Sequence, residues 1–301
     1  MVAGGWRLTV GAAVLVTGAL FAPTAAQAGT GCEWIRTDLP VPAGQHSSGP
    51  LAGDGDWLTS TTWGESVVVW HQEVPETVTF QEQRGVYDIT REGVLLSGGG
   101  SGLWRGGEKL EPLPGRRSTT VHSMNAGGDV VGRSGGALVV WPAGSTEPTV
   151  LEDTEDGLAW WPKGIDDDGN VIGVSDDEGP DRGYVWNPDG ERVELQPLED
   201  HDQVSPSLIR NGRVFGTSMV RGDYQGISVE WNLRGEIVRT LPGGAVTAAN
   251  GAGDLISGNV VRRANGRVDP LPSDVFPDVL AENGDVFGGR YFEGPVKLRC
   301  A

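Results

Sequence analysis

A five-residue pattern recurs seven times along this chain of 301 residues and constrains its fold more than any other feature. Each copy begins with glycine, has apolar residues at its third and fourth positions, and ends in Gly, Ser or Thr. Successive copies start 31 to 43 residues apart, at Gly55, Gly93, Gly128, Gly169, Gly212, Gly253 and Gly284. An internal repeat of this period indicates an array of similar structural units.

The residues around each glycine predict four short strands per unit. An apolar residue four positions earlier and an Asn, Asp or Gly turn indicate two strands joined by a tight hairpin. Next comes an apolar strand that ends in tryptophan in five copies, then a Gly or Pro turn and a strand that closes near Leu-Pro. The five tryptophans, which we expect to pack between sheets, are Trp70, Trp104, Trp141, Trp186 and Trp231. Four strands in about 39 residues match one blade, so the sequence predicts an all-β, seven-bladed β-propeller.

The last copy ends one strand short, and a segment at the other end of the chain can supply that strand. Residues 32–41 resemble the closing strands of the other copies, so we expect them to lie beside residues 294–300. This arrangement would bring Cys32 and Cys300, the two cysteines of the chain, within bonding distance. The alternative is a lipid anchor on Cys32, but the preceding "GTG" lacks the aliphatic residue that such an anchor site requires.

The first 28 residues have the pattern of a secretory signal. Arg7 precedes an apolar run to about Phe21, and "AQA" ends at Ala28. We therefore expect an exported, monomeric protein with a single domain at residues 29–301. Without the signal the chain has 22 basic and 41 acidic residues, a net charge of −19. This charge repels phosphate backbones, which argues against nucleic acid and leaves cations, sugars and proteins as partners.

The stretch "IDDDGNVIG" from Ile165 to Gly173 could be a cation loop, a catalytic cluster or a turn. Gly169 occupies the turn position of the repeat, and Asp is a good turn residue because it bonds its own backbone. No acidic residue closes the loop as a calcium-binding EF-hand requires. The sequence favours a turn, with no cofactor and calcium only as a weak alternative.

The glycine frame, the aromatic-ended strand and the Leu-Pro ending resemble the bacterial extracellular repeats named after a His-Ala-Phe (HAF) tripeptide. The tripeptide itself is absent, and "RGYVW" or "ISVEW" stands in its place. The resemblance covers essentially all of residues 29–301. It implies a propeller-like array, and it brings no catalytic residues.

Loops on one face of the predicted propeller vary in length and carry unusual chemistry. Carboxylates beside paired indoles suit a carbohydrate or a cationic group. The candidates are Trp160, Trp161, Asp176, Asp177, Glu178, Asp181, Asp200, His201, Asp223 and Tyr224. Alternatively, the charges serve solubility and the two indoles fill a seam between blades. The "RGD" at Arg221 resembles an integrin-binding tripeptide, but three residues match by chance too often to count.

A second candidate region is the central channel, which the first strand of each blade should line. His122 shares its repeat position with Tyr87, Lys163, Thr247 and Asp278, a mixed polar set that fits an axial site or ordered water. No nucleophile elbow, phosphate loop or zinc spacing is present. The sequence favours non-enzymatic binding of a carbohydrate or protein. The alternatives are a polysaccharide hydrolase or lyase, which buried axial carboxylates with raised pKa values would favour, and a structural or adhesive protein.

Overall fold

The computed structural model describes residues 31–45, 51–60, 63–99, 102–116, 118–153, 159–176, 181–222, 226–290 and 293–301. The predicted signal at residues 1–28 lies outside these ranges. The described part of the chain consists of strands, turns and irregular segments. It contains no helix with the length and hydropathy of a membrane span.

Hydrogen bonding sorts the strands into six antiparallel sheets, one with seven strands and five with four. The seven-stranded sheet contains β2 (Leu51–Asp54), β3 (Trp57–Ser60), β4 (Trp63–His71), β5 (Val74–Ile89), β6 (Leu95–Gly99), β7 (Gly102–Arg105) and β8 (Glu108–Leu110). Two four-stranded sheets follow, with β9 (Thr119–Met124), β10 (Val130–Ser134), β11 (Ala137–Trp141) and β12 (Thr149–Glu152), and with β13 (Ala159–Ile165), β14 (Val171–Asp176), β15 (Arg182–Trp186) and β16 (Arg192–Glu194).

The next two sheets contain β17 (Gln203–Arg210), β18 (Arg213–Met219), β19 (Ile227–Asn232) and β20 (Ile237–Leu241), and β21 (Val246–Ala249), β22 (Leu255–Ser257), β23 (Val260–Arg262) and β24 (Val268–Pro270). The last sheet combines β25 (Val275–Leu280), β26 (Val286–Arg290) and β27 (Gly294–Cys300) with β1 (Trp34–Asp38) from the start of the described chain.

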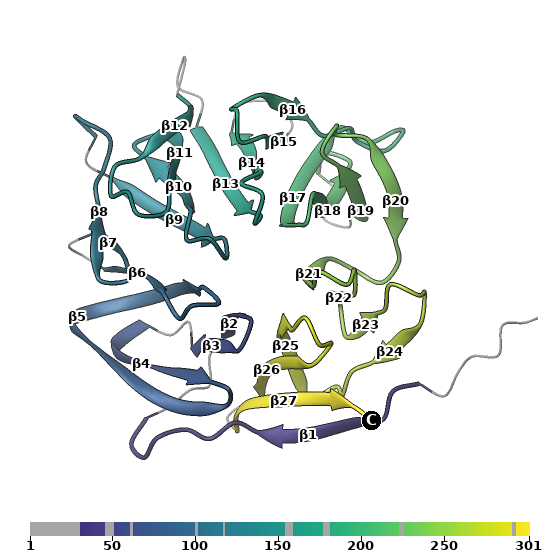
Figure 1. Cartoon of the computed structure of the whole chain (residues 1–301). Helices are drawn as coiled ribbons and strands as arrows, with labels where there is room; N and C mark the ends of the chain where they lie inside the picture. Colours follow the sequence, from purple (N-terminus) through teal and green to yellow (C-terminus); the bar gives the residue numbers. More distant parts are fainter. Residues whose placement is uncertain are drawn as a thin grey trace, which may run out of the picture. The chain divides into compact units, whose positions relative to one another are not determined.

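The sheets stand around a common axis, each with one edge toward the centre (Figure 1). The innermost strands are β2, β5, β9, β13, β17, β21 and β25. Each contacts the next around the axis, and β25 contacts β2, which closes the ring. Radially arranged antiparallel sheets in a closed ring form a β-propeller, so the predicted fold class is confirmed.

The count of seven blades stays a prediction, because hydrogen bonding joins the first two repeats into one sheet. Strand β5 pairs with β4 from residue 74 onward and with β6 through residues 84–89. Its sequence, "VPETVTFQEQRGVYDI", lacks the Leu-Pro that closes several of the other repeats. Without that turn signal, the chain passes from the outer strand of one repeat into the innermost strand of the next as one extended segment.

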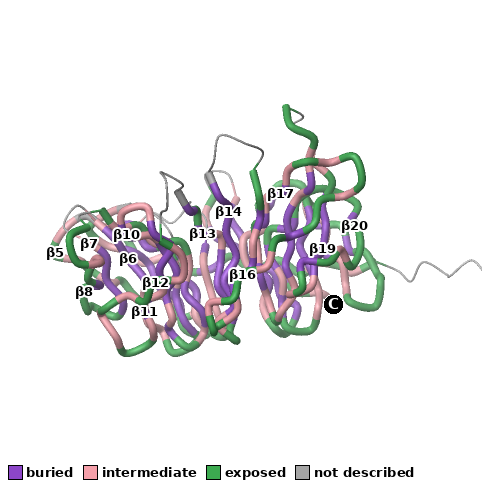
Figure 2. Tube along the Cα trace, turned by 90° about the horizontal axis from the view of Figure 1, so that it is seen from above, coloured by how far each residue is buried: buried purple, intermediate pink, exposed green. Residues whose placement is uncertain are grey.

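Buried residues run along the strands of the sheets (Figure 2). The apolar core lies between neighbouring sheets, and tryptophan provides much of it. Trp231, for example, packs with Val185 and Leu195 of the preceding sheet, and its indole N–H donates to the Gln196 carbonyl at 2.7 Å. Trp141 donates to the Glu111 carbonyl at 2.8 Å in the same way. All five repeat tryptophans are buried, which confirms their predicted packing role.

The ring closes as predicted from the two ends of the sequence repeat. Strand β1 pairs antiparallel with β27, with Trp34 opposite Cys300. Cys32 and Cys300 form a disulfide with their Cα atoms 5.3 Å apart. β1 also contacts the sheet before the last one, because the Trp34 indole donates to the Pro270 carbonyl at 2.6 Å and the Cys32 N–H donates to Asp269 at 3.2 Å.

The Asp-rich stretch at Ile165–Gly173 is a hairpin turn that also joins two sheets. Asp166 is buried, and its carboxylate accepts hydrogen bonds from the backbone N–H groups of Asp168 and Asn170 within the turn. It accepts another from the Gly212 N–H of the next sheet, at 3.0 Å. The preferred interpretation of this stretch as a turn therefore agrees with the structure. The hydrogen bonds to Asp166, and not glycine alone, stabilise the conformation of the turn.

Candidate functional site

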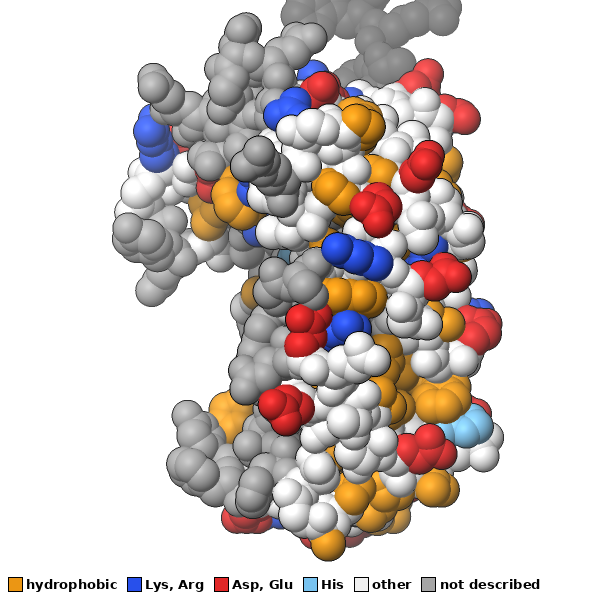
Figure 3. All heavy atoms as spheres, turned by 90° about the vertical axis from the view of Figure 1, so that its left-hand side faces the viewer, with side chains coloured by type: hydrophobic (Ala, Val, Ile, Leu, Met, Phe, Trp, Pro, Cys, Tyr) orange, Lys and Arg blue, Asp and Glu red, His pale blue; other side chains and the backbone are white. Residues whose placement is uncertain are grey.

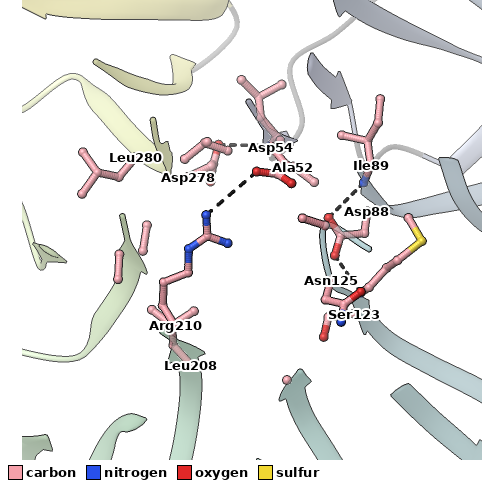
Figure 4. A pocket seen from close by; sticks show the side chains of 18 of the residues that line it. Ala52, Asp54, Asp88, Ile89, Ser123, Asn125, Leu208, Arg210, Asp278 and Leu280 are labelled. Atoms are coloured by element: carbon pink, nitrogen blue, oxygen red, sulfur yellow. Dashed lines mark hydrogen bonds and ion pairs between the residues drawn. The ribbon is translucent and has the colours of Figure 1, made fainter. Parts of the chain in front are cut away.

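A cavity lies on the axis of the propeller, and residues from all seven innermost strands line it. Its volume is about 330 Å³, at the small end of the range of ligand pockets. Figure 4 shows side chains from different sheets, among them Arg210, Asp54 and Asp88, around the same space. By contrast, the described outer surface beside β5, β7 and β8 mixes acidic, basic and hydrophobic side chains (Figure 3). We therefore consider the axial cavity as the candidate site.

A β-bulge repeats in six of the seven innermost strands and supplies polar side chains to this cavity. In each of them the pairing with the second strand of the sheet skips one residue, and a bulge redirects the side chain of its extra residue. The skipped residues are Tyr87, His122, Lys163, Ser207, Thr247 and Asp278. All except Ser207 line the cavity. We call these six residues the bulge layer.

The small residue that ends each sequence repeat leaves room for the bulged backbone opposite it. It lies on the second strand, opposite the residue before the skipped one, and is glycine in β10, β14, β18 and β26. A Cβ atom at Gly216 would lie 2.3 Å from the Ser205 carbonyl oxygen, and one at Gly288 would lie 2.1 Å from that of Phe276. The bulged backbone passes close to this position, which is glycine opposite four of the six bulged strands and serine, Ser97 and Ser257, opposite the other two. This residue is the signal by which the bulge could be found in the sequence.

The sequence spacing identifies five members of the bulge layer, and the structure places those five around one cavity. It does not identify Ser207, because the hairpin of that repeat is shorter. Its turn is formed by Asn211 and Gly212, which have φ angles of 49° and 69°. Alignment on the glycine therefore shifts this strand by one residue.

Charged side chains at the hairpin ends of the innermost strands pair across the axis. The Arg210 guanidinium lies 2.7 Å from a Glu282 carboxylate oxygen, 3.7 Å from Asp167 and 3.9 Å from Asp54. Arg91 lies 3.6 Å from Asp54 and 3.4 Å from Asp167. Since β17 and β2 are not neighbours in the ring, these ion pairs connect sheets on different sides of the cavity.

Two carboxyl groups of the cavity, Asp88 and Asp278, are held by backbone N–H groups. Asp88 accepts hydrogen bonds from Ile89 and Met124 at 2.9 Å each. Asp278 accepts one from Leu51 at 3.1 Å. Burial raises the pKa of each carboxyl to about 6, and for Asp88 the nearby charge of Asp54 adds to this effect.

Two other residues of the bulge layer, His122 and Lys163, are basic. Burial lowers the pKa of His122, and the positive charge of Lys163 lowers it further. The imidazole is therefore neutral at pH 7, next to a charged ammonium group. With the hydroxyl groups of Tyr87 and Thr247, the cavity offers several kinds of donor and acceptor within one small space.

The paired indoles expected on the loop face point in different directions. Trp160 is 4% exposed, and its ring packs at 5.5 Å from both Tyr184 and Trp186. Trp161 is 46% exposed, and the Arg133 guanidinium lies 4.0 Å from the centre of its ring. Neighbouring residues of a strand face opposite sides of the sheet, so the two indoles do not form one platform. Trp160 fills a seam, as the alternative interpretation expects.

The other loop candidates are only partly brought together. Asp181 lines a separate cavity of about 280 Å³ near Arg182, Glu194 and Asp202. Asp200 is exposed, and the His201 Nδ1 lies 3.0 Å from the Ser218 hydroxyl. Asp177, Glu178, Asp223 and Tyr224 lie outside the described residues, as does the side chain of Asp176. As ligand-binding residues, these candidates stay predictions.

Among the described residues, no group of three or more His, Cys, Asp or Glu side chains has a geometry that could hold a metal ion. The carboxylates of the cavity accept hydrogen bonds from backbone N–H groups or pair with arginine. The described cavity offers hydrogen bonding and charge.

No protein-family model matches the chain, and no curated protein matches it in sequence. Solved structures do match it in fold. Virginiamycin B lyase from Staphylococcus aureus is 12% identical, covers 89% of this chain and 99% of its own, and has a TM-score of 0.60. A chain of the mitotic checkpoint complex is 15% identical, with coverage of 98% and 99% and a TM-score of 0.56. YCF48 from Cyanidioschyzon merolae is 15% identical, with coverage of 87% and 98% and a TM-score of 0.51. At these identities the similarity establishes the β-propeller fold and nothing finer.

Proposed function

We propose that this chain is a secreted binding protein that holds a carbohydrate in its axial cavity. The observation that carries the proposal is the bulge layer, which brings an ammonium group, an imidazole, two kinds of hydroxyl and a carboxyl to one cavity. Sugar hydroxyls both donate and accept hydrogen bonds, so they match such a mixed set. The disulfide and the N-terminal signal pattern support export.

In this proposal, two exposed aromatic side chains on the same strands, outside the residues that line the cavity, contact the part of the sugar that extends beyond it. Trp161 on β13 and Phe276 on β25 occupy the same position, two residues before the bulge residues Lys163 and Asp278. They are 46% and 50% exposed. The face of a sugar ring stacks favourably on such rings. In this proposal Trp161 keeps its predicted role, and Trp160 serves packing.

The proposal is tested by screening the purified secreted protein on a glycan array and titrating each hit by tryptophan fluorescence. Two matched variants locate the site: Lys163→Ala changes the cavity, and Asp181→Ala with Asp200→Ala changes the loop face. We expect Lys163→Ala to weaken binding about tenfold or more, as loss of a charged hydrogen bond does, and the loop variant to bind normally. The opposite pattern would place the site on the loops, and silence on every glycan would contradict carbohydrate binding.

A second candidate function is polysaccharide hydrolysis or elimination, and one observation favours it. Asp278 and Asp88 have pKa values of about 6, so each carries a proton in mildly acidic solution as a general acid must. Asp278 is the better candidate, because only one hydrogen bond to backbone, from Leu51, is described for it. An assay for new sugar ends below pH 6, with Asp278→Asn as the control, separates an enzyme from a binding protein.

A further inference from the structure

The charges around the axial cavity are unequal. Among the described residues that line it, the acidic ones outnumber the basic ones. The acidic residues are Asp54, Asp88, Asp167, Asp278 and Glu282, and the basic ones are Lys163 and Arg210. With His122 neutral, the lining is negative at pH 7.

Arginine side chains neutralise only part of this negative charge. Asp54, Asp167 and Glu282 have guanidinium partners within 4 Å, from Arg91 or Arg210. For the other two carboxylates, the described hydrogen bonds come from backbone N–H groups alone. A backbone N–H carries no full charge, so it cannot neutralise a carboxylate as an arginine does.

The Asp278 and Asp88 carboxylates each bond the next innermost strand around the ring. Asp278, on β25, accepts from the Leu51 N–H of β2, and Asp88, on β5, accepts from the Met124 N–H of β9. Figure 4 shows both carboxylates at the same cavity, with Asp54 between them in the view. Lys163 and His122 come from β13 and β9 instead. The two carboxylates, which we call the carboxylate wall, therefore flank β2 and β5, while Lys163 and His122, which we call the basic wall, are carried by β13 and β9.

We infer that the ligand of this cavity is an amino sugar, with its ammonium group against the carboxylate wall formed by Asp88 and Asp278. This inference rests on the proposed function, because it specifies the kind of carbohydrate. An ammonium group supplies the missing positive charge and three hydrogen-bond donors to these acceptors. The ring hydroxyls then meet Tyr87, Thr247 and the basic wall.

The two carboxyl groups make the binding depend on pH. Their pKa values of about 6 mean that they are mostly protonated at pH 5 and mostly ionised at pH 7. Since an ammonium group needs the ionised form, affinity for an amino sugar should rise about tenfold over this interval. The other charged or titratable groups that face the space are Asp54, Tyr87, His122, Lys163, Asp167, Arg210 and Glu282.

The test compares two probes that differ at the nitrogen: the dimer of D-glucosamine, which is cationic, and the dimer of N-acetyl-D-glucosamine, which is neutral. Isothermal titration at pH 7 should give about tenfold tighter binding of the cationic dimer. The preference should disappear at pH 5 and in Asp278→Asn, which retains an oxygen to accept from the Leu51 N–H. A second variant, Thr247→Val, removes a hydroxyl without changing charge and should weaken both dimers while keeping their ratio.

The possible outcomes separate the two proposals. Equal affinity for both dimers, or a preference that persists in Asp278→Asn and Asp88→Asn, would overturn the amino-sugar inference and leave carbohydrate binding in place. Failure of both dimers, together with a glycan array that shows only other sugars, would also overturn the inference alone. Silence on the whole array would overturn both. Thermal unfolding of each variant confirms that it is folded.

Discussion

Asp166 shows how a single side chain can determine both a turn and a contact between sheets. It lies three residues before the repeat glycine, and Asn125 and Asn250 occupy the same position in two other repeats. Asn125 donates to the Asp166 carbonyl at 3.0 Å, and Asn250 donates to the Ala281 carbonyl at 3.1 Å, each in the next sheet. In these three repeats the position joins neighbouring sheets, and the short polar side chain of Asp or Asn bonds the local backbone as well.

Replacing Asp166 with alanine should destabilise the protein by about 3 kcal/mol, the scale for losing charged hydrogen bonds to buried donors. The N–H groups of Asp168, Asn170 and Gly212 would lose their acceptor. Urea unfolding measures the change. Asp168→Ala is the matched control, since the Asp168 side chain is exposed in the same turn. Equal stabilities of the two variants would show that the turn does not depend on this carboxylate.

At this scale, the sequence predicts the turn but not the contact across the sheets. Glycine spacing and Asp-rich composition are local signals, and local hydrogen bonding follows from them. The hydrogen bond from the Gly212 N–H to Asp166 joins residues that are 46 apart in sequence, so it depends on how closely their two sheets approach. The same limit applies to Asp278, whose position in the repeat is visible in the sequence while its partner, the Leu51 N–H, is not.

Among the elements, the innermost strands allow a better prediction of the candidate site from the sequence than the loops do. The repeat spacing predicts that they line a channel, and they do. The bulge that directs Tyr87, His122, Lys163, Thr247 and Asp278 into it is not visible as a strand signal, because it leaves the apolar pattern intact on both sides. What the sequence does record is the small residue opposite the bulge, a steric requirement of the pairing rather than of the strand itself.

The interface between two sheets should depend on tryptophan for shape and for one hydrogen bond. Trp231→Phe removes the donor to the Gln196 carbonyl and leaves a gap beside Leu195, so we expect a loss of about 2 kcal/mol in the free energy of unfolding. Trp161→Phe is the control, because that indole is 46% exposed, and it should change stability by less than about 0.5 kcal/mol. A similar loss of unfolding free energy in both variants would mean that burial does not dominate the contribution of Trp231 to stability.

For the whole molecule, the decisive element is the one that joins the two ends of the chain. The last repeat lacks a strand, and a segment at the start of the chain matches it. Together they predict that β1 pairs with β27, and the positions of the two cysteines agree with this pairing. The prediction succeeds because ring closure is a global constraint that leaves a mark in the sequence. The boundary between the first two repeats has no comparable signal in the sequence, because β5 runs through it without a turn.

Loss of the disulfide should weaken this closure without opening the ring completely. The bond joins residues 268 apart in sequence, and loop entropy gives it a contribution of up to about 5 kcal/mol to stability. Other contacts persist without it, including the Trp34 indole bond to Pro270 and the ion pair of Arg36 with Asp274 at 2.7 Å. In a Cys32→Ser, Cys300→Ser variant, the unfolding midpoint should therefore fall while the folded ring remains.

Hydrogen exchange distinguishes this outcome from a general loss of stability. In the double serine variant, amide exchange should increase first in β1 and in its partner β27, because these strands make the contact that the disulfide restrains. Strands β13 to β20, on the other side of the ring, should keep their protection until global unfolding. Uniform acceleration in every sheet would mean that the ring opens cooperatively as a unit, and an unchanged midpoint would mean that strand pairing alone holds the two ends together.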